Sequence, residues 1–197
     1  MVIRSDLLPP GTHGSNIRGL VDRKIWDALR IPVCTATGNR CEICGDQVIR
    51  NGRIGRPDCH EKWIFEFHPD RPIQRLIALC PGCHQVQHSG LARVKGREQE
   101  VIERLCRLNR WSRRQAELDL NRSTARCTHR DRFNWDLDLS ALHGRLIIHS
   151  YPTLHIPAAD RATLGNSFFG LPPHGSAHLT RADSPETYEI LKHIASQ

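Results

Sequence analysis

The chain has 197 residues, of which 39% are hydrophobic and 25% are charged, and its formal net charge is +7. This composition excludes a wholly disordered chain, and no apolar run approaches the ~18 residues that a membrane-spanning helix needs. The first residues lack a basic segment followed by an apolar one, so we expect a cytoplasmic rather than a secreted protein. In that compartment the 8 cysteines favour metal binding or reactive thiols over disulfides.

Hydrophobic periodicity, capping residues and prolines predict the elements in chain order. The first half of the chain indicates an extended segment to about Leu20, a helix from Asp22 to about Arg30, and two short strands and a helix within residues 41–88. The second half indicates helices from Gly96 to about Asn109 and from Ser112 to about Arg126, strands over Phe133–Leu142 and Leu146–His155, and a helix from Ser184 to about Ala195. Pro32 should end or kink the first helix. The mixture predicts an α+β fold.

Four consecutive segments are expected along the chain. They are an N-terminal extended segment and helix (1–40), a cysteine-rich core (41–95), a basic helical region with a strand (96–143) and a C-terminal mixed extension of unassigned role (144–197). Basic charge is concentrated near the third segment, because residues 89–132 hold twelve Arg and Lys against six acidic residues.

Two C-x-x-C pairs, Cys41/Cys44 and Cys80/Cys83, are the strongest signal in the sequence. Two intervening residues let both sulfurs of a pair turn toward one ion, and Gly45 and Gly82 favour that turn. Two such pairs complete a tetrahedral thiolate shell, which is typical of a structural Zn²⁺ site. Either pair alone is also compatible with a thiol redox motif. The other thiols without a partner at ligand spacing (Cys34, Cys106 and Cys127) are expected to pack as small hydrophobic residues.

Histidines lie inside and directly after this cysteine pattern. His84 and His88 follow the second pair at an i, i+4 spacing, which places both imidazoles on one helical face where they can share a divalent ion. His60 lies between the pairs, at the polar start of the apolar stretch 59–65.

These residues resemble the HNH endonucleases, the ββα-metal nuclease family. The resemblance is carried by Leu76–His84, which reads L-I-A-L-C-P-G-C-H, by His88, and by the segments Gly38–Gly45, Cys59–Trp63 and Gly90–Ala92. Within that family it extends to a bacterial HNH endonuclease-like subgroup and covers roughly residues 15–142. It implies a small zinc-stabilised ββα-metal core flanked by helices.

The resemblance also implies roles for individual residues. His60 would be the general base that takes a proton from the attacking water, a task suited to an imidazole because its ordinary pKa lies near working pH. His84 and His88, with Cys59, would hold one divalent cation such as Mg²⁺, Mn²⁺ or Zn²⁺. The implied activity is metal-dependent hydrolysis of phosphodiester bonds in DNA.

The sequence departs from the family pattern at two positions. Cys59 stands where the family has a metal-binding Asp, with Asp58 and Glu61 nearby as substitutes, and thiolate ligation favours Zn²⁺ over Mg²⁺. Arg75 stands where an Asn orients the base, and arginine cannot accept a hydrogen bond. These departures favour the alternative hypothesis of a non-catalytic zinc-stabilised module that binds DNA or protein.

Arginines that follow the histidine pair are the candidate contacts to double-stranded DNA. They could touch phosphates without reading base sequence, although solvated helix faces explain such charge equally well. The candidates are Arg93, Arg97, Arg104, Arg107, Arg110, Arg113 and Arg114. No membrane partner is expected, and the C-terminal extension could dock a protein partner or a second copy of the chain.

Overall fold

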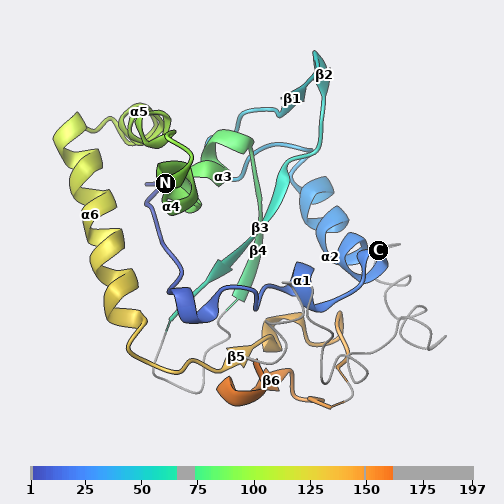
Figure 1. The fold of residues 1–197 in the computed structure, drawn as a ribbon. Coiled ribbons are helices and arrows are strands. Elements are labelled where there is room, and N and C mark those ends of the chain that lie inside the picture. The colour runs from blue at the N-terminus through green and yellow to red at the C-terminus, as the bar shows by residue number, and fades with distance from the viewer. Residues whose placement is uncertain (1, 66–73, 149, 162–197) are drawn as a thin grey trace. The chain divides into compact units, whose positions relative to one another are not determined.

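The computed structural model describes residues 2–65, 74–148 and 150–161 (Figure 1). Its helices are α1 (Ile17–Leu20), α2 (Arg23–Ala36), α3 (Pro81–Gln87), α4 (Ser89–Val94), α5 (Glu98–Asn109) and α6 (Arg113–Arg130), with 3₁₀ turns at Pro10–Thr12 and Ser140–Leu142. Its strands are β1 (Ile49–Arg50), β2 (Arg53–Ile54), β3 (Asp58–Trp63), β4 (Gln74–Leu79), β5 (Leu137–Asp138) and β6 (His155–Ile156). The strands pair as β1–β2, β3–β4 and β5–β6. This mixture of helices and small sheets agrees with the predicted α+β class.

The chain forms two compact units that interleave along the sequence. The first comprises Met1–Pro9, Val33–His60 and Ile77–Arg132, and the second comprises Pro10–Pro32, Glu61–Leu76 and Phe133–Gln197. No helix in the described ranges combines the length and apolar character that crossing a membrane requires.

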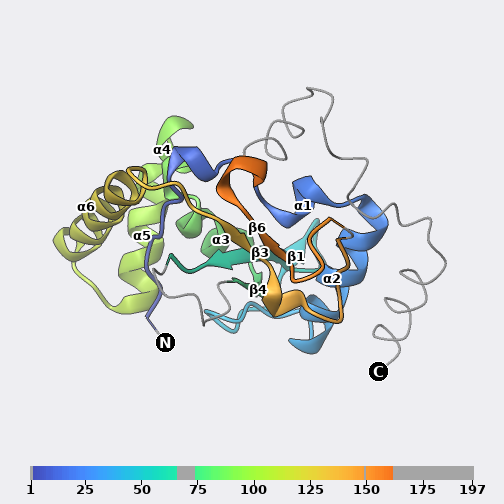
Figure 2. The ribbon, with the colours of Figure 1, turned by 90° about the horizontal axis from the view of Figure 1, so that it is seen from below.

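Helices α3 to α6 and the two cysteine pairs build the core of the first unit. Helix α5 packs against α3, α4 and α6, as Figure 1 and Figure 2 show. Val101 and Leu105 of α5 are buried, and their neighbours in the core include Leu79, Val86, Ala116 and Leu120. Ser112 caps α6 through a complete capping box with Gln115, which confirms the predicted helix start.

An extended N-terminal segment is hydrogen-bonded to α6 in the first unit. The buried Asp119 carboxylate accepts from the Ser5 backbone N–H at 2.9 Å and from the Arg4 guanidinium at 3.1 Å. The Ser5 hydroxyl also lies 2.6 Å from that of Ser89 and 3.1 Å from that of Ser123. Buried polar contacts therefore hold these first residues in the predicted extended conformation. The prediction of an extended segment to about Leu20 is wrong beyond Pro9, because the 3₁₀ turn Pro10–Thr12 and helix α1 follow.

Three predictions about the second unit and its boundaries were wrong or fall outside the described residues. Helix α2 continues through Pro32 to Ala36, where the buried Cys34 thiol donates to the Pro57 carbonyl at 3.5 Å and holds the last turn. The predicted strands over 133–142 and 146–155 are reduced to the two-residue pair of β5 and β6, with turns between them. The predicted helix after Ser184 lies outside the described residues.

Candidate functional site

The four-cysteine cluster (Cys41, Cys44, Cys80 and Cys83) is held by two knuckles in the first unit. The first knuckle turns at Gly45, which has a φ of +73°. Its Glu42 backbone N–H donates to the Ala78 carbonyl in β4, and the Ala78 N–H donates to the Glu42 carboxylate. The second begins α3, where the Cys80 sulfur accepts from the Cys83 N–H. Gly82 lies in the first turn of α3 without a positive φ, so this knuckle does not depend on the conformational freedom of glycine that the sequence was expected to use.

The sulfur geometry fits a tetrahedral metal ion such as zinc. The four sulfurs lie within 4.8 Å of one another, and those of Cys44 and Cys80 are 3.7 Å apart. A zinc ion with bonds of about 2.3 Å separates its sulfurs by about 3.8 Å. The predicted four-cysteine site is therefore confirmed as a cluster that could hold a metal ion.

The crowded thiols perturb one another's protonation. Hydrogen bonds from Cys80 and Cys83 hold the pKa of Cys41 well below its usual range, whereas burial raises the pKa of Cys44 to about 12. The hydrogen bond with Cys41 raises the pKa of Cys83. Neighbouring thiolates repel one another, so a bound cation is needed before all four sulfurs can lose their protons together.

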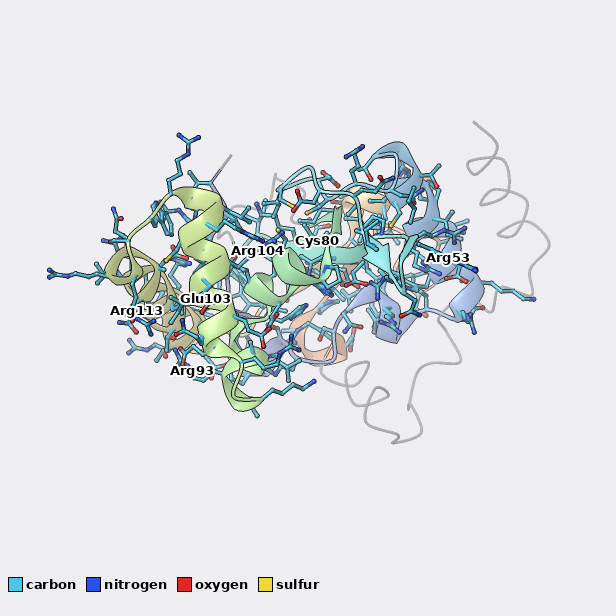
Figure 3. The ribbon with its side chains drawn as sticks, turned by 90° about the horizontal axis from the view of Figure 1, so that it is seen from above. Arg53, Cys80, Arg93, Glu103, Arg104 and Arg113 are labelled. Atoms are coloured by element: carbon cyan, nitrogen blue, oxygen red, sulfur yellow. The ribbon has the colours of Figure 1, made fainter. Side chains whose placement is uncertain are left out.

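Arg104 of α5 reaches this cluster and was not predicted to do so. Its Nη2 donates to the sulfurs of Cys80, Cys44 and Cys83 at 3.0, 3.2 and 3.3 Å, and its side chain is only 13% exposed (Figure 3). Gly82 leaves room for it, because a Cβ at Gly82 would lie 3.3 Å from the Arg104 Nε. Arg104 therefore belongs with the sulfurs and not with the exposed arginines with which the sequence grouped it.

The positive charge of Arg104 should raise the affinity of the four-cysteine cluster for a metal ion. Four thiolates and one divalent ion carry a net charge of −2, and one guanidinium offsets half of it. Arg104→Gln is expected to keep one metal ion per cluster but to weaken its affinity by about 10–100-fold, which is typical when a group that bonds the ligands is removed. Competition with a chromophoric chelator measures this change. Arg122→Gln, which removes an exposed charge from α6, is the control. Equal affinities for the two variants would contradict the role.

The histidine cluster (His60, His84 and His88) gathers where β3 meets α3. His84 and His88 lie one turn apart, with their Nε2 atoms separated by 3.1 Å. The His60 ring lies edge-on to both, with centroid distances of 5.2 and 5.1 Å. One nitrogen from each imidazole lies within 4.8 Å of the others. A metal–nitrogen bond of about 2.0–2.1 Å separates tetrahedral ligands by about 3.3 Å, so the three rings also fit a divalent ion.

Asp58 orients His84. Its Oδ2 lies 3.2 Å from the His84 Nδ1, and its Oδ1 accepts from Arg50 at 2.6 Å. The hydrogen bond with His84 holds the pKa of Asp58 below its usual range. A carboxylate that bonds one imidazole nitrogen leaves the other nitrogen unprotonated and directed at a metal ion.

Strand alternation decides which residues of β3 can join this cluster. Successive side chains of a strand point to opposite faces, so Asp58 and His60 share one face and Cys59 and Glu61 share the other. The buried Glu61 carboxylate accepts from the backbone N–H groups of Ile17 and Arg18 at 3.0 and 3.2 Å. The structure thus brings His60 to His84 and His88, and the predicted ligand Cys59 is not in the group.

Most of the predicted nucleic-acid contacts are exposed, but three of them are ion-paired. Arg93 pairs with Glu98, Arg97 with Glu100 and Arg113 with Glu117, each at 2.7 Å. Figure 3 labels Arg93 and Arg113 on this surface. The exposed Arg107, Arg110 and Arg114 take part in none of the ion pairs between described residues.

Two of these contacts could have been found in the sequence. The sequence does not reveal that Asp58 meets His84, but the two-residue spacing of Asp58 and His60 in a strand does place both on one face. The Asn51-Gly52 dipeptide between Arg50 and Arg53 signals a two-residue hairpin that carries basic residues beside Asp58. Nothing in the spacing of Arg104 distinguishes it from its exposed neighbours.

Comparison with known proteins gave no match, whether among protein-family models, curated proteins or solved structures.

Proposed function

We propose that this chain is a metal-dependent endonuclease of the HNH type that hydrolyses phosphodiester bonds in DNA, with a structural zinc ion in the four-cysteine cluster. The observation that carries the proposal is the histidine cluster: three imidazoles meet within ligand distance between a strand and a helix that the cysteines anchor. Such a combination of a closed thiolate site and an imidazole site suits one structural ion and one reactive ion.

Each residue of the cluster has a role in the proposed hydrolysis. His84 and His88 hold the divalent ion, and Asp58 keeps His84 in the tautomer that binds it. His60 takes the proton from the attacking water. A divalent ion held there would supply the positive charge that phosphodiester hydrolysis requires. In this assignment Cys59 has no role in the reaction, whereas the resemblance to the HNH family implied that it is a metal ligand.

Exposed arginines support nucleic acid as the substrate. Arg107 lies in α5, Arg110 is its C-cap residue and Arg114 lies in the first turn of α6, all in the same compact unit as the histidine cluster. Guanidinium groups bind phosphate oxygens through paired N–H donors, and such contacts position a backbone without selecting a base sequence.

Nicking of supercoiled plasmid by the zinc-loaded protein tests the proposal. Open circular product is expected only when Mg²⁺, Mn²⁺ or additional Zn²⁺ is present, because the histidine cluster must be filled. The double variant His84→Ala/His88→Ala should lose this product, and His143→Ala, which changes an exposed histidine, should retain it. Cleavage by the double variant, or no cleavage with any of these ions, would contradict the proposal.

A non-catalytic nucleic-acid-binding module is the second candidate function. The observation that favours it is the position of the acidic side chains: Glu61 is bonded to α1, and Asp58 is engaged by His84 and Arg50. The expected acidic metal ligand is therefore missing from the histidine cluster. Salt-dependent DNA binding without cleavage under any metal ion would support this candidate.

A further inference from the structure

The β1–β2 hairpin is a two-stranded ribbon whose residues are exposed on both faces. Ile49 pairs with Ile54 and Arg50 with Arg53 in antiparallel register. Asn51 and Gly52 form the connection with φ values of 52° and 73°, the two positive values of a type I′ turn. An isolated hairpin of this length is marginally stable in water, so its exposed side chains suit contact with another molecule.

One face of the hairpin is apolar. Ile49 and Ile54 lie directly opposite each other and are 59% and 63% exposed. Cross-strand partners point to the same face, so the two side chains form one continuous apolar patch. Large exposed aliphatic side chains that adjoin each other usually mark an interaction site.

The other face of the hairpin is cationic. Arg50 and Arg53 are cross-strand partners, and like charges directly opposite each other destabilise a hairpin unless an anion lies between or beside them. Residues 47–57 contain three arginines and no acidic residue. Arg50 is satisfied by Asp58 at 2.6 Å, whereas none of the ion pairs in the described chain includes Arg53. A molecule of opposite charge that could cover this face is a polyanion.

The hairpin is also linked to the histidine cluster. Asp58 accepts from Arg50 with one carboxylate oxygen, and its other oxygen lies 3.2 Å from the His84 Nδ1. The hairpin, Asp58 and the histidine cluster all belong to the first compact unit. A change at the hairpin therefore reaches the cluster through one carboxylate.

We infer that the β1–β2 hairpin is the element that grips duplex DNA beside the histidine cluster. This inference rests on the proposed function. Arg53 and the exposed Arg56 contact backbone phosphates, and the Ile49/Ile54 patch packs against sugars and base edges as an apolar wedge. Figure 3 labels Arg53 on the hairpin. Arg93 and Arg113 pair with Glu98 and Glu117, whereas Arg53 takes part in no ion pair between described residues.

Fluorescence anisotropy with a phosphorothioate duplex, which resists cleavage, separates binding from hydrolysis. Arg53→Gln is expected to weaken binding and to reduce the slope of log affinity against log salt by about one unit. Ile54→Ser should weaken binding about tenfold with no change in slope, because it removes apolar burial and no charge. Arg23→Gln is the matched control, since Arg23 is 91% exposed on α2 and far outside the hairpin in sequence.

Wild-type affinity and salt slope in both hairpin variants, with thermal unfolding unchanged, would overturn the inference. So would a change of oligomeric state in Ile54→Ser without a change in DNA binding, because the patch would then contact a second copy of the chain. DNA binding that depends on the hairpin, without plasmid cleavage, would support the inference and reject the proposed nuclease activity. Plasmid cleavage that is unaffected by the hairpin variants would support the nuclease activity and reject the inference.

Discussion

Cys83→Ser is expected to abolish metal binding at the four-cysteine cluster and to unfold the first compact unit. Cys83 is fully buried, and its sulfur lies in the core with Leu79, Val86 and Leu105. Structural zinc sites contribute about 10–16 kcal/mol of apparent binding free energy. The net stability of a whole domain is only about 5–15 kcal/mol, so losing the ion exceeds what packing can offset.

Metal analysis by mass spectrometry and thermal unfolding by circular dichroism measure this effect. Cys127→Ser is the control, because the Cys127 thiol donates to the Leu8 carbonyl at 3.4 Å and a serine hydroxyl can replace it. Chelation of wild-type protein should reproduce the unfolding caused by Cys83→Ser, even where that variant cannot be purified. A wild-type protein that keeps its thermal midpoint after the metal is stripped would reject the structural role.

The cysteine and histidine clusters were largely predictable because short-range spacing determines them. Two residues between cysteines restrict a knuckle to one turn geometry, and an i, i+4 pair fixes His84 and His88 on one helical face. The capping box at Ser112 is local in the same way. Features that depend on neighbours within a few residues need no knowledge of the tertiary fold.

The remaining features depend on contacts between distant residues. Arg104 lies 60 residues after Cys44, and only the packing of α5 against α3 brings its guanidinium to the sulfurs. Helix α2 continues through Pro32, and two residues later the buried Cys34 thiol bonds the Pro57 carbonyl, 23 residues away in sequence. Alternating residues after Phe133 resemble a strand, yet Leu139, Leu142 and Leu146 are buried from turns. Hydrophobic periodicity predicts which side chains are buried, but it does not determine whether a strand or a series of turns carries them.

The carried-over role of Cys59 shows how a resemblance can shift by one residue. A family motif assigns roles by sequence position, but a strand assigns its side chains to faces by parity. Asp58 and His60 lie on the face of β3 that contacts His84. The acidic and the imidazole group on this strand are therefore two residues apart. In this arrangement Asp58 contacts His84 and is not one of the three grouped residues that could hold a metal ion.

His60→Ala is expected to lower the rate of plasmid cleavage by about 10²–10⁴-fold, which is typical when a general base is removed. DNA affinity and the metal content of the histidine cluster should stay at wild-type values, because His84 and His88 remain on α3 with Asp58 behind them. Cobalt substitution gives a separate readout, since its visible absorption reports the number of nitrogen ligands independently of cleavage.

Two other outcomes would change the assignment of His60. An unchanged cleavage rate would place the base elsewhere. Loss of the second metal ion, with an altered cobalt spectrum, would make His60 a third imidazole ligand, which its distance to the other two rings permits. His143→Ala, an exposed substitution in the second unit, controls for the loss of an imidazole as such. Because His60 shares a strand face with Asp58, its replacement tests the chemistry of the cluster while Asp58 still holds His84 in place.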